Sequence, residues 1–283
     1  MELPRDYTLK LHWPDCSGMV AGIESEGWPD SCRNGGRFPV GIVAGFVRNT
    51  QLIAIADIHG HLEKLKRLLE IVSPTNGDRL VFLGDYIDRG PDPAGVIEHL
   101  IQLAARFPQT VFLRGNHEQV AMDALVSCIP GCLSGYQRLA ERDDLYLMKT
   151  EHRRDLDIWL RNDGTSTLLS YGINLPVDDE DLRVIPKTHI DFLGRTKLWH
   201  RENGFLFVHA GAMEGRPLDR QIDTLLRGRY GPPGTSETHV VGHQVTPDGQ
   251  PYFEPGRYSL DTGAGNGKAL TACDVLTQEF WQA

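Results

Sequence analysis

Short apolar runs recur along the chain, and each one ends in polar residues. Three of these runs cover residues 52–56, 81–83 and 111–113, and helical patterns lie between them. The runs are apolar without alternation, which suits strands that are covered on both faces. Strands that alternate with helices in this way predict a largely parallel sheet. Two later runs, residues 205–208 and 240–242, predict further strands.

The helical patterns repeat apolar residues every three or four positions. The first runs through Leu62, Leu65, Leu68 and Leu69, and the second through Val96, Ile97, Leu100 and Leu103. We expect the second helix to begin near Asp92 and Pro93, because proline suits the first turn of a helix. A third helical stretch follows residue 118.

After His243 the pattern is that of strands alone, over residues 252–253, 257–260 and 269–275 and near Phe280. Gly265-Asn266-Gly267 lies between two apolar runs and is typical of a hairpin turn. Helix-rich parallel units followed by a strand-rich tail predict an α/β fold. We expect a four-layer α/β/β/α sandwich of two mixed sheets with helices outside.

Two segments differ from this pattern. Residues 1–51 are rich in glycine and proline and predict an irregular N-terminal extension to a domain over residues 52–283. Residues 128–197 are more polar, with helical patterns over 155–160 and 182–193, the second broken by Pro186. We expect this helical insertion to cap the edge of the sheet and to shape a substrate groove, although a packing role is also open.

Composition narrows the class of protein. The 283 residues carry a formal net charge of −9, which argues against a nucleic-acid polymer as partner, although a local metal pair could still hold a phosphate. No run is long and apolar enough to span a membrane. The five cysteines form no C-x-x-C pair and indicate thiols in a reducing compartment. We expect a cytoplasmic monomer.

Metal-binding side chains follow five of the predicted strands. A lone histidine after a strand is more often a packing or capping residue, but five such ends are hard to attribute to chance. Because strands of a parallel sheet end at one edge, we expect these side chains to meet there. Oxygen and nitrogen ligands without thiolate indicate manganese, iron or zinc. The candidate ligands at these strand ends are Asp57, His59, Asp85, Asn116, His209 and His243, and the polar residues Asp88, Arg89, His117 and Glu118 lie beside them in the sequence.

The order of these clusters resembles that of the calcineurin-like metallophosphoesterases. The motifs are D-x-H-G at residues 57–60, G-D-x-x-D-R-G at 84–90, G-N-H-E at 115–118, H-A-G at 209–211 and G-H at 242–243. Asp88 before Arg89 makes the chain most similar to the phosphoprotein phosphatase branch, and especially to its small bacterial members. The resemblance extends from residue 52 to the C-terminus.

The resemblance implies two divalent metal ions, with manganese, iron or zinc as the candidates. Asp57 and His59 would hold one ion, Asn116, His209 and His243 the other, and Asp85 would bridge both. Hydrolysis of a phosphate monoester requires more than about 20 kcal/mol of barrier reduction. Two ions roughly 3.5–4 Å apart supply much of it by acidifying a bridging water and holding the phosphoryl oxygens.

The resemblance also implies roles for the charged residues beside these ligands. His117 would protonate the leaving oxygen, and Asp88 would orient its imidazole. Arg89 would bind phosphate oxygens, with Asn116 also expected to contact substrate. Arg229 is a candidate second phosphate-binding arginine, although Leu225-Leu226-Arg227-Gly228-Arg229 departs from the LLWIR-like form of the family. His61 is expected to support the ligands or to cap a helix, and Glu118 to support the ligands as an acceptor or to form an ion pair. His200 and His239 are expected to be structural.

Three functions remain open from the sequence. The first is a metal-dependent protein phosphatase that acts on phosphoserine, phosphothreonine or phosphotyrosine in a protein or peptide. The second is a dinucleoside polyphosphate hydrolase similar to the symmetrical diadenosine tetraphosphatases, which usually lack an aspartate at the position of Asp88. The third is a metal-free regulatory binding protein, against which the complete set of ligand positions argues.

Overall fold

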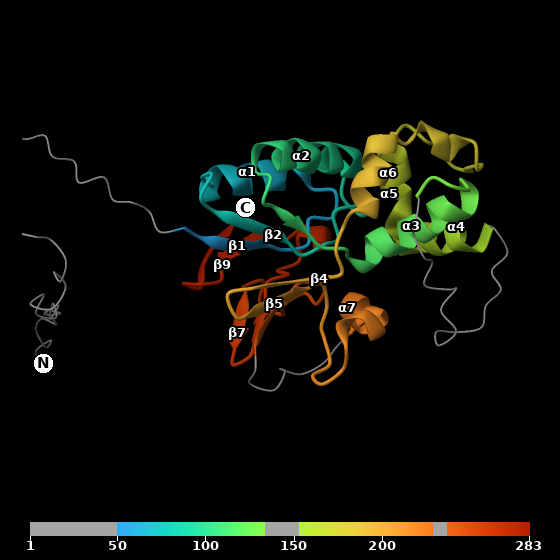
Figure 1. Cartoon of the computed structure of the whole chain (residues 1–283). Coiled ribbons are helices and arrows are strands. Elements are labelled where there is room, and N and C mark those ends of the chain that lie inside the picture. The colour runs from blue at the N-terminus through green and yellow to red at the C-terminus, as the bar shows by residue number, and fades with distance from the viewer. Residues whose placement is uncertain (1–49, 134–152, 229–236) are drawn as a thin grey trace, which may run out of the picture. The chain divides into compact units, whose positions relative to one another are not determined.

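The computed structural model describes residues 50–133, 153–228 and 237–283. Within these segments the strands form two five-stranded sheets (Figure 1). The first sheet has the order β10-β9-β1-β2-β3 and the second β4-β5-β6-β8-β7. The first consists of β1 (Leu52–Ile55), β2 (Arg79–Phe82), β3 (Val111–Phe112), β9 (Thr271–Asp274) and β10 (Glu279–Gln282). The second consists of β4 (Trp199–Glu202), β5 (Phe205–Val208), β6 (Thr238–Val241), β7 (Tyr252–Glu254) and β8 (Arg257–Ser259).

Both sheets are mixed. In the first, β1, β2 and β3 run parallel, as the strand–helix alternation predicts, whereas β9 is antiparallel to β1 and β10 to β9. In the second, β5, β6 and β8 run parallel, with β4 and β7 added antiparallel at the edges. The parallel strands β5, β6 and β8 therefore occupy the centre of the second sheet, whereas β1, β2 and β3 form one side of the first sheet as far as its edge. Because parallel strands run in one direction, their carboxyl ends lie at the same edge of each sheet.

Alternating residues of β1 bury both faces of the first sheet. Ile53 and Ile55 belong to a core cluster with helices α1 (Leu62–Val72) and α2 (Pro93–Arg106). Leu52 and Ala54 point the other way, into a second cluster with Phe207 of β5, because successive side chains of a strand face opposite sides. This packing explains why the strand is apolar throughout and confirms the predicted face-to-face sheets.

The outer face of the second sheet is covered by a further helix. Leu206 and Val208 of β5 pack with Leu225 of α7 (Ile222–Arg227) in a third core cluster. Helices thus lie outside both sheets, and the predicted four-layer α/β/β/α sandwich is confirmed (Figure 1). The remaining helices are α3 (Asn116–Cys128), α4 (Arg153–Trp159), η3 (Leu160–Gly164), α5 (Thr165–Ser170), η4 (Asp181–Val184), α6 (Lys187–Gly194), η5 (Leu218–Arg220) and η6 (Ala264–Asn266).

One local prediction is wrong. Residues 265–267 do not form a hairpin turn, because β8 and β9 belong to different sheets and the 3₁₀ helix η6 lies in the connection. The start of α2 is confirmed, since Pro93 is its first residue and the Asp92 side chain accepts a hydrogen bond from the Gly95 amide at 2.8 Å. Pro186 separates η4 from α6, as expected.

The predicted N-terminal extension lies outside the described residues up to position 49, and so does Arg229. The domain limits at residues 51 and 52, and the limits of the insertion, stay predictions. Among the helices that the structure describes, none combines the length and apolarity that crossing a membrane would require.

Candidate metal centre and active site

The polar residues that follow β1, β2 and β6 adopt unusual backbone conformations. His59, Asp85, Asp88, Arg89 and His243 all have positive φ, between 48° and 69°. This left-handed region is costly for residues other than glycine and persists only where the surroundings enforce it. The strain is therefore concentrated in the loops that carry the candidate ligands, which is typical of a functional site.

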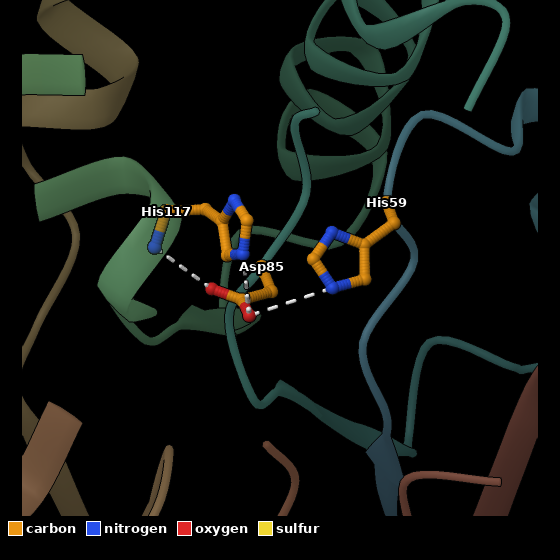
Figure 2. A group of neighbouring side chains, drawn as sticks. All are labelled: His59, Asp85 and His117. Atoms are coloured by element: carbon orange, nitrogen blue, oxygen red, sulfur yellow. Dashed lines mark hydrogen bonds and ion pairs between the residues drawn. The ribbon is translucent and has the colours of Figure 1, made fainter. Parts of the chain in front are cut away.

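Asp85 is the centre of the cluster and is almost fully buried. Its Oδ2 lies 3.5 Å from His59 Nε2, 3.4 Å from His209 Nε2 and 4.0 Å from His117 Nε2. Its Oδ1 accepts a hydrogen bond from the His117 amide at 3.1 Å, and Figure 2 shows the carboxylate between the rings of His59 and His117. Burial raises the pKa of Asp85, but the surrounding histidines outweigh it and hold the pKa well below its usual range.

Two histidines offer their Nε2 atoms to this carboxylate. Nδ1 of His59 lies 3.0 Å from the Ile87 carbonyl, and Nδ1 of His209 lies 2.9 Å from the Leu83 carbonyl. A carbonyl partner keeps the proton on Nδ1 and leaves Nε2 as a metal ligand, which is the usual arrangement in metal sites. Burial lowers the pKa of His59 to about 3, so its ring is neutral.

A second group of candidate ligands shares Asp85. Asp85, His209 and His243 bring ligand atoms within 4.8 Å of one another, as do His59, Asp85 and His117. The His209 and His243 rings meet edge to face with centroids 5.0 Å apart, and Asn116 Oδ1 lies 3.0 Å from His209 Nε2. Burial lowers the pKa of His209, but the charges of Asp85 and Asp57 outweigh it and raise the pKa to about 10.

Asp57 tests whether this donor set fits a cation. Its Oδ2 accepts a hydrogen bond from the His243 amide at 2.9 Å, but its buried Oδ1 has no hydrogen-bond partner among the described residues. Burial and the nearby Asp261 raise the pKa of Asp57 well above its usual range. Gly242 is required beside it, because a Cβ there would lie 2.1 Å from Asp57 Oδ1. An orphaned, buried carboxylate oxygen beside imidazole nitrogens fits a divalent cation.

Asp88 and His117 form a buried pair beside the ligands. Asp88 Oδ2 lies 2.7 Å from His117 Nδ1, while Asp88 itself is fully buried. Burial raises the pKa of Asp88, and hydrogen bonds from His117, Thr167 and Trp159 oppose this effect. Burial lowers the pKa of His117, but Asp85 and Asp88 outweigh it, so the pKa lies above its ordinary value. The pair is therefore built to hold a proton on the imidazole.

Arg89 reaches the same histidine from the solvent side. Its Nη2 lies 3.4 Å from His117 Nε2, and its Nε lies 3.3 Å from Asp163 Oδ2. About a third of the Arg89 side chain is exposed, at 32%. A planar guanidinium in this position can bind phosphate oxygens with two parallel hydrogen bonds.

Glu118 supports the site without joining it. Its carboxylate accepts hydrogen bonds from four backbone amides, those of Asp85, Tyr86, Ile87 and Gly115, at 2.8–3.3 Å. These bonds join the start of α3 to the loop that carries Asp85, which agrees with the supporting role predicted for Glu118. His61 precedes α1 and makes no side-chain capping bond, and the pKa of His61 is lowered by its partial burial.

Three buried residues near the site escape the sequence reasoning. Trp159, at the end of α4, and Thr167, in α5, both donate hydrogen bonds to Asp88. Asp261 follows β8 by two residues, and burial together with the nearby Asp85 raises its pKa. Its position after a strand is the same signal that identifies the candidate ligands, whereas Trp159 and Thr167 carry no metal-ligand signature.

Two mixed sheets with an aspartate and histidine cluster at their strand ends are the architecture of metal-dependent phosphoesterases. A family model described as calcineurin-like phosphoesterase matches residues 50–262, three quarters of the chain. The chain therefore belongs to the calcineurin-like phosphoesterase family.

Individual relatives are similar over shorter stretches. The chain is 33% identical over 88 residues to the serine/threonine-protein phosphatase PP2A-like PPG1 of Saccharomyces cerevisiae, covering 31% of this chain and 24% of the relative. It is 37% identical over 103 residues to the serine/threonine-protein phosphatase rdgC of Drosophila melanogaster, covering 34% of this chain and 16% of the relative. The matches thus span only a minor part of these relatives.

A solved structure assigned as a diadenosine tetraphosphatase shares the fold more completely. It superposes with a TM-score of 0.54 and 21% identity, covering 83% of this chain and 93% of the other. At this identity the likeness concerns the fold alone.

Proposed function

We propose that the protein is a dimetal phosphomonoesterase that removes phosphate from phosphoserine or phosphothreonine in proteins, and accepts phosphotyrosine. The observation that carries this proposal is the Asp88–His117 pair, 2.7 Å apart and buried beside the candidate metal ligands. The family and the similarity to serine/threonine-protein phosphatases support it.

The donor set supports a division of the ligands between two ions. Asp57 and His59 would hold one ion, Asn116, His209 and His243 the other, and Asp85 would bridge them. When bound, the two ions would polarise the phosphoryl group and acidify the attacking water. Manganese, iron and zinc all suit these ligands.

The chain's own residues would manage the leaving group. Arg89 would exchange its contact with His117 for the phosphate oxygens, which frees His117 Nε2 to face the ester oxygen. As water oxygen bonds to phosphorus and the P–O ester bond breaks, the Nε2 proton would pass to the leaving oxygen. Asp88 would hold the Nδ1 proton and stabilise the charged imidazole before this transfer.

This acid favours a phosphomonoester over a dinucleoside polyphosphate. The serine or threonine alkoxide is a strong base and leaves readily only with a proton, whereas a nucleoside polyphosphate is a weak base that leaves without one. A buried Asp88–His117 pair would thus contribute little to cleaving a phosphoanhydride. Cytoplasmic action as a monomer, without nucleic acid or membrane, remains a prediction from composition.

The proposal is tested with manganese-loaded protein on matched substrates. Phosphoserine, phosphothreonine and phosphotyrosine peptides are compared with diadenosine tetraphosphate by release of phosphate or nucleotide. We expect hydrolysis of the peptides, and Arg89→Lys should raise their KM because lysine cannot bind two oxygens in parallel. Arg67→Lys on the exposed side of α1 is the control. Inertness toward every peptide with fast dinucleotide cleavage would refute the proposal.

A further inference from the structure

The stretch from the end of α4 through η3 into α5 contacts the active site at three residues that are spaced four positions apart. Trp159 ends α4, Asp163 lies in η3, and Thr167 lies in α5. All three contact the Asp88–Arg89 segment, which is 70 or more residues away along the chain. A helical insertion whose role is packing alone would not be expected to direct three polar contacts at one dipeptide.

Thr167 fixes the side chain of Asp88 relative to its own backbone. The Thr167 hydroxyl accepts a hydrogen bond from the Asp88 amide at 2.9 Å and donates one to Asp88 Oδ1 at 2.6 Å. Both residues are almost fully buried. Because the Asp88 backbone has a φ of 69°, this closed pair of hydrogen bonds also supports a strained conformation.

Trp159 completes the environment of the same oxygen. Its Nε1–H donates to Asp88 Oδ1 at 3.1 Å, and the indole is 1% exposed. An indole N–H is only a donor, so Oδ1 is held as an acceptor. Oδ1 is thus occupied by Trp159 and Thr167, and Oδ2 is left to face His117 Nδ1.

Asp163 makes the weakest of the three contacts. Its carboxylate lies 3.3 Å from Arg89 Nε, but the Asp163 side chain is 62% exposed. Solvent screens such a pair, so its contribution is small. The inference therefore rests on the two buried residues.

We infer that Thr167 and Trp159 are positioning residues that orient the Asp88 carboxylate toward His117, so that the insertion helices set the alignment of the general acid. This rests on the proposed function and deepens it, because it assigns part of the catalytic geometry to residues that bind neither metal nor phosphate. Both residues hydrogen-bond to Asp88, and through it they act on His117.

Substrates with different leaving groups distinguish an effect on the general acid from an effect on the stability of the fold. A 4-nitrophenolate ion departs without a proton, whereas the alkoxide of phosphoserine needs one. A residue that acts through the acid should therefore affect a phosphoserine peptide more than 4-nitrophenyl phosphate. A residue that only stabilises the fold should affect both substrates equally.

The test compares Thr167→Val with Thr167→Ser on both substrates at saturating manganese, with metal content measured for each variant. Valine keeps the shape without the hydroxyl, and we expect kcat on the phosphoserine peptide to fall about 10- to 100-fold, within the range of general-acid effects. The loss on 4-nitrophenyl phosphate should stay below about threefold. Serine should restore the peptide activity, and metal content should stay that of the unsubstituted protein.

Trp159→Phe provides a second variant, since it removes the donor and keeps an aromatic ring; we expect the same selective loss. Ser170→Ala is the matched control on α5, because the Ser170 hydroxyl bonds to the Ala94 amide and the Thr167 carbonyl, not to Asp88. Equal losses on both substrates would overturn the inference. So would a selective loss in Ser170→Ala, or in Thr167→Ser.

A readout without turnover separates this inference from the proposed function. If the unsubstituted protein hydrolyses neither substrate, the proposed function fails, and the inference is judged by the ¹⁵N spectrum of the His117 ring in zinc-loaded protein. We expect a protonated Nδ1 in the unsubstituted protein and in Thr167→Ser, and a mixture of protonated and unprotonated Nδ1 in Thr167→Val. An unchanged ring spectrum in Thr167→Val would overturn the inference.

Discussion

Replacing Glu118 by glutamine tests whether this buried carboxylate holds the metal-binding loop in place. Glu118 Oε2 accepts hydrogen bonds from the amides of Asp85 and Gly115, at 2.8 and 2.9 Å. Glu118 Oε1 accepts hydrogen bonds from the amides of Tyr86 and Ile87, at 2.8 and 3.3 Å. Glu118 is fully buried, so water cannot replace a lost acceptor. In Glu118→Gln an amide nitrogen replaces one of the two carboxylate oxygens, and this nitrogen can only donate. Whichever oxygen is replaced, the two backbone amides that bonded to it lose their acceptor.

The expected loss follows from these contacts. A hydrogen bond to a charged group contributes about 1.5–3 kcal/mol, so losing two costs about 3–6 kcal/mol. The lower value applies if the amide replaces Oε1, because the bond from the Ile87 amide is already long at 3.3 Å. A typical domain has a free energy of unfolding of about 5–15 kcal/mol, so the change would remove a large share.

The assay is urea unfolding of metal-free protein followed by circular dichroism. Burial and the nearby Asp85 raise the pKa of Glu118 to about 7, so the measurement is made at about pH 8, where the carboxylate is ionised. Glu70→Gln on the exposed side of α1 is the control, with an expected change within about 0.5 kcal/mol. A loss below about 1 kcal/mol in Glu118→Gln would refute the reasoning.

Three further predictions concern the metal site and the residues beside it. His117→Ala should lower turnover of a phosphoserine peptide about 10²–10⁴-fold with metal content unchanged, whereas Asp85→Asn should lose metal and activity together; metal loss in His117→Ala would instead make its ring a ligand. Removal of metal with EDTA should lower Tm increasingly from about pH 4.5 to 7. The reason is that burial lowers the pKa of His209 but Asp85 and Asp57 outweigh it and raise the pKa to about 10, so a bound ion displaces a proton and metal binding strengthens as pH rises; a Tm difference that is constant with pH would contradict this. Gly265→Ala should weaken metal binding about 10- to 100-fold, because its Cβ would lie 2.4 Å from His59 Cδ2, and unchanged affinity on isothermal titration would argue against it.

Much of the site could be predicted because parallel strands deliver their C-terminal residues to one edge. Asp57 and His59 follow β1, Asp85 follows β2, and the structure brings His59 and Asp85 within 3.5 Å. No pattern in the sequence indicates that His59 and Asp85 adopt positive φ. That conformation is imposed by surrounding contacts, such as the bonds from Asp85 and its neighbours to Glu118, and not by local preference.

The contacts that sequence reasoning missed join residues far apart along the chain. Thr167 and Asp88 are separated by 79 positions, and no periodicity within either segment encodes their hydrogen bond. The hairpin expected at residues 265–267 is wrong for a related reason. Glycine and asparagine there favour a tight turn, but β8 and β9 pair with different sheets, and a 3₁₀ helix carries the chain between them.

We propose that side chains from separate strand ends hold two divalent ions around Asp85. Anomalous diffraction at the manganese edge, from crystals of manganese-loaded protein, tests it most directly. We expect two peaks roughly 3.5–4 Å apart, one on each side of the Asp85 carboxylate, with Asp57 Oδ1 bonded to one of them. A single peak, or peaks away from Asp85, would contradict it.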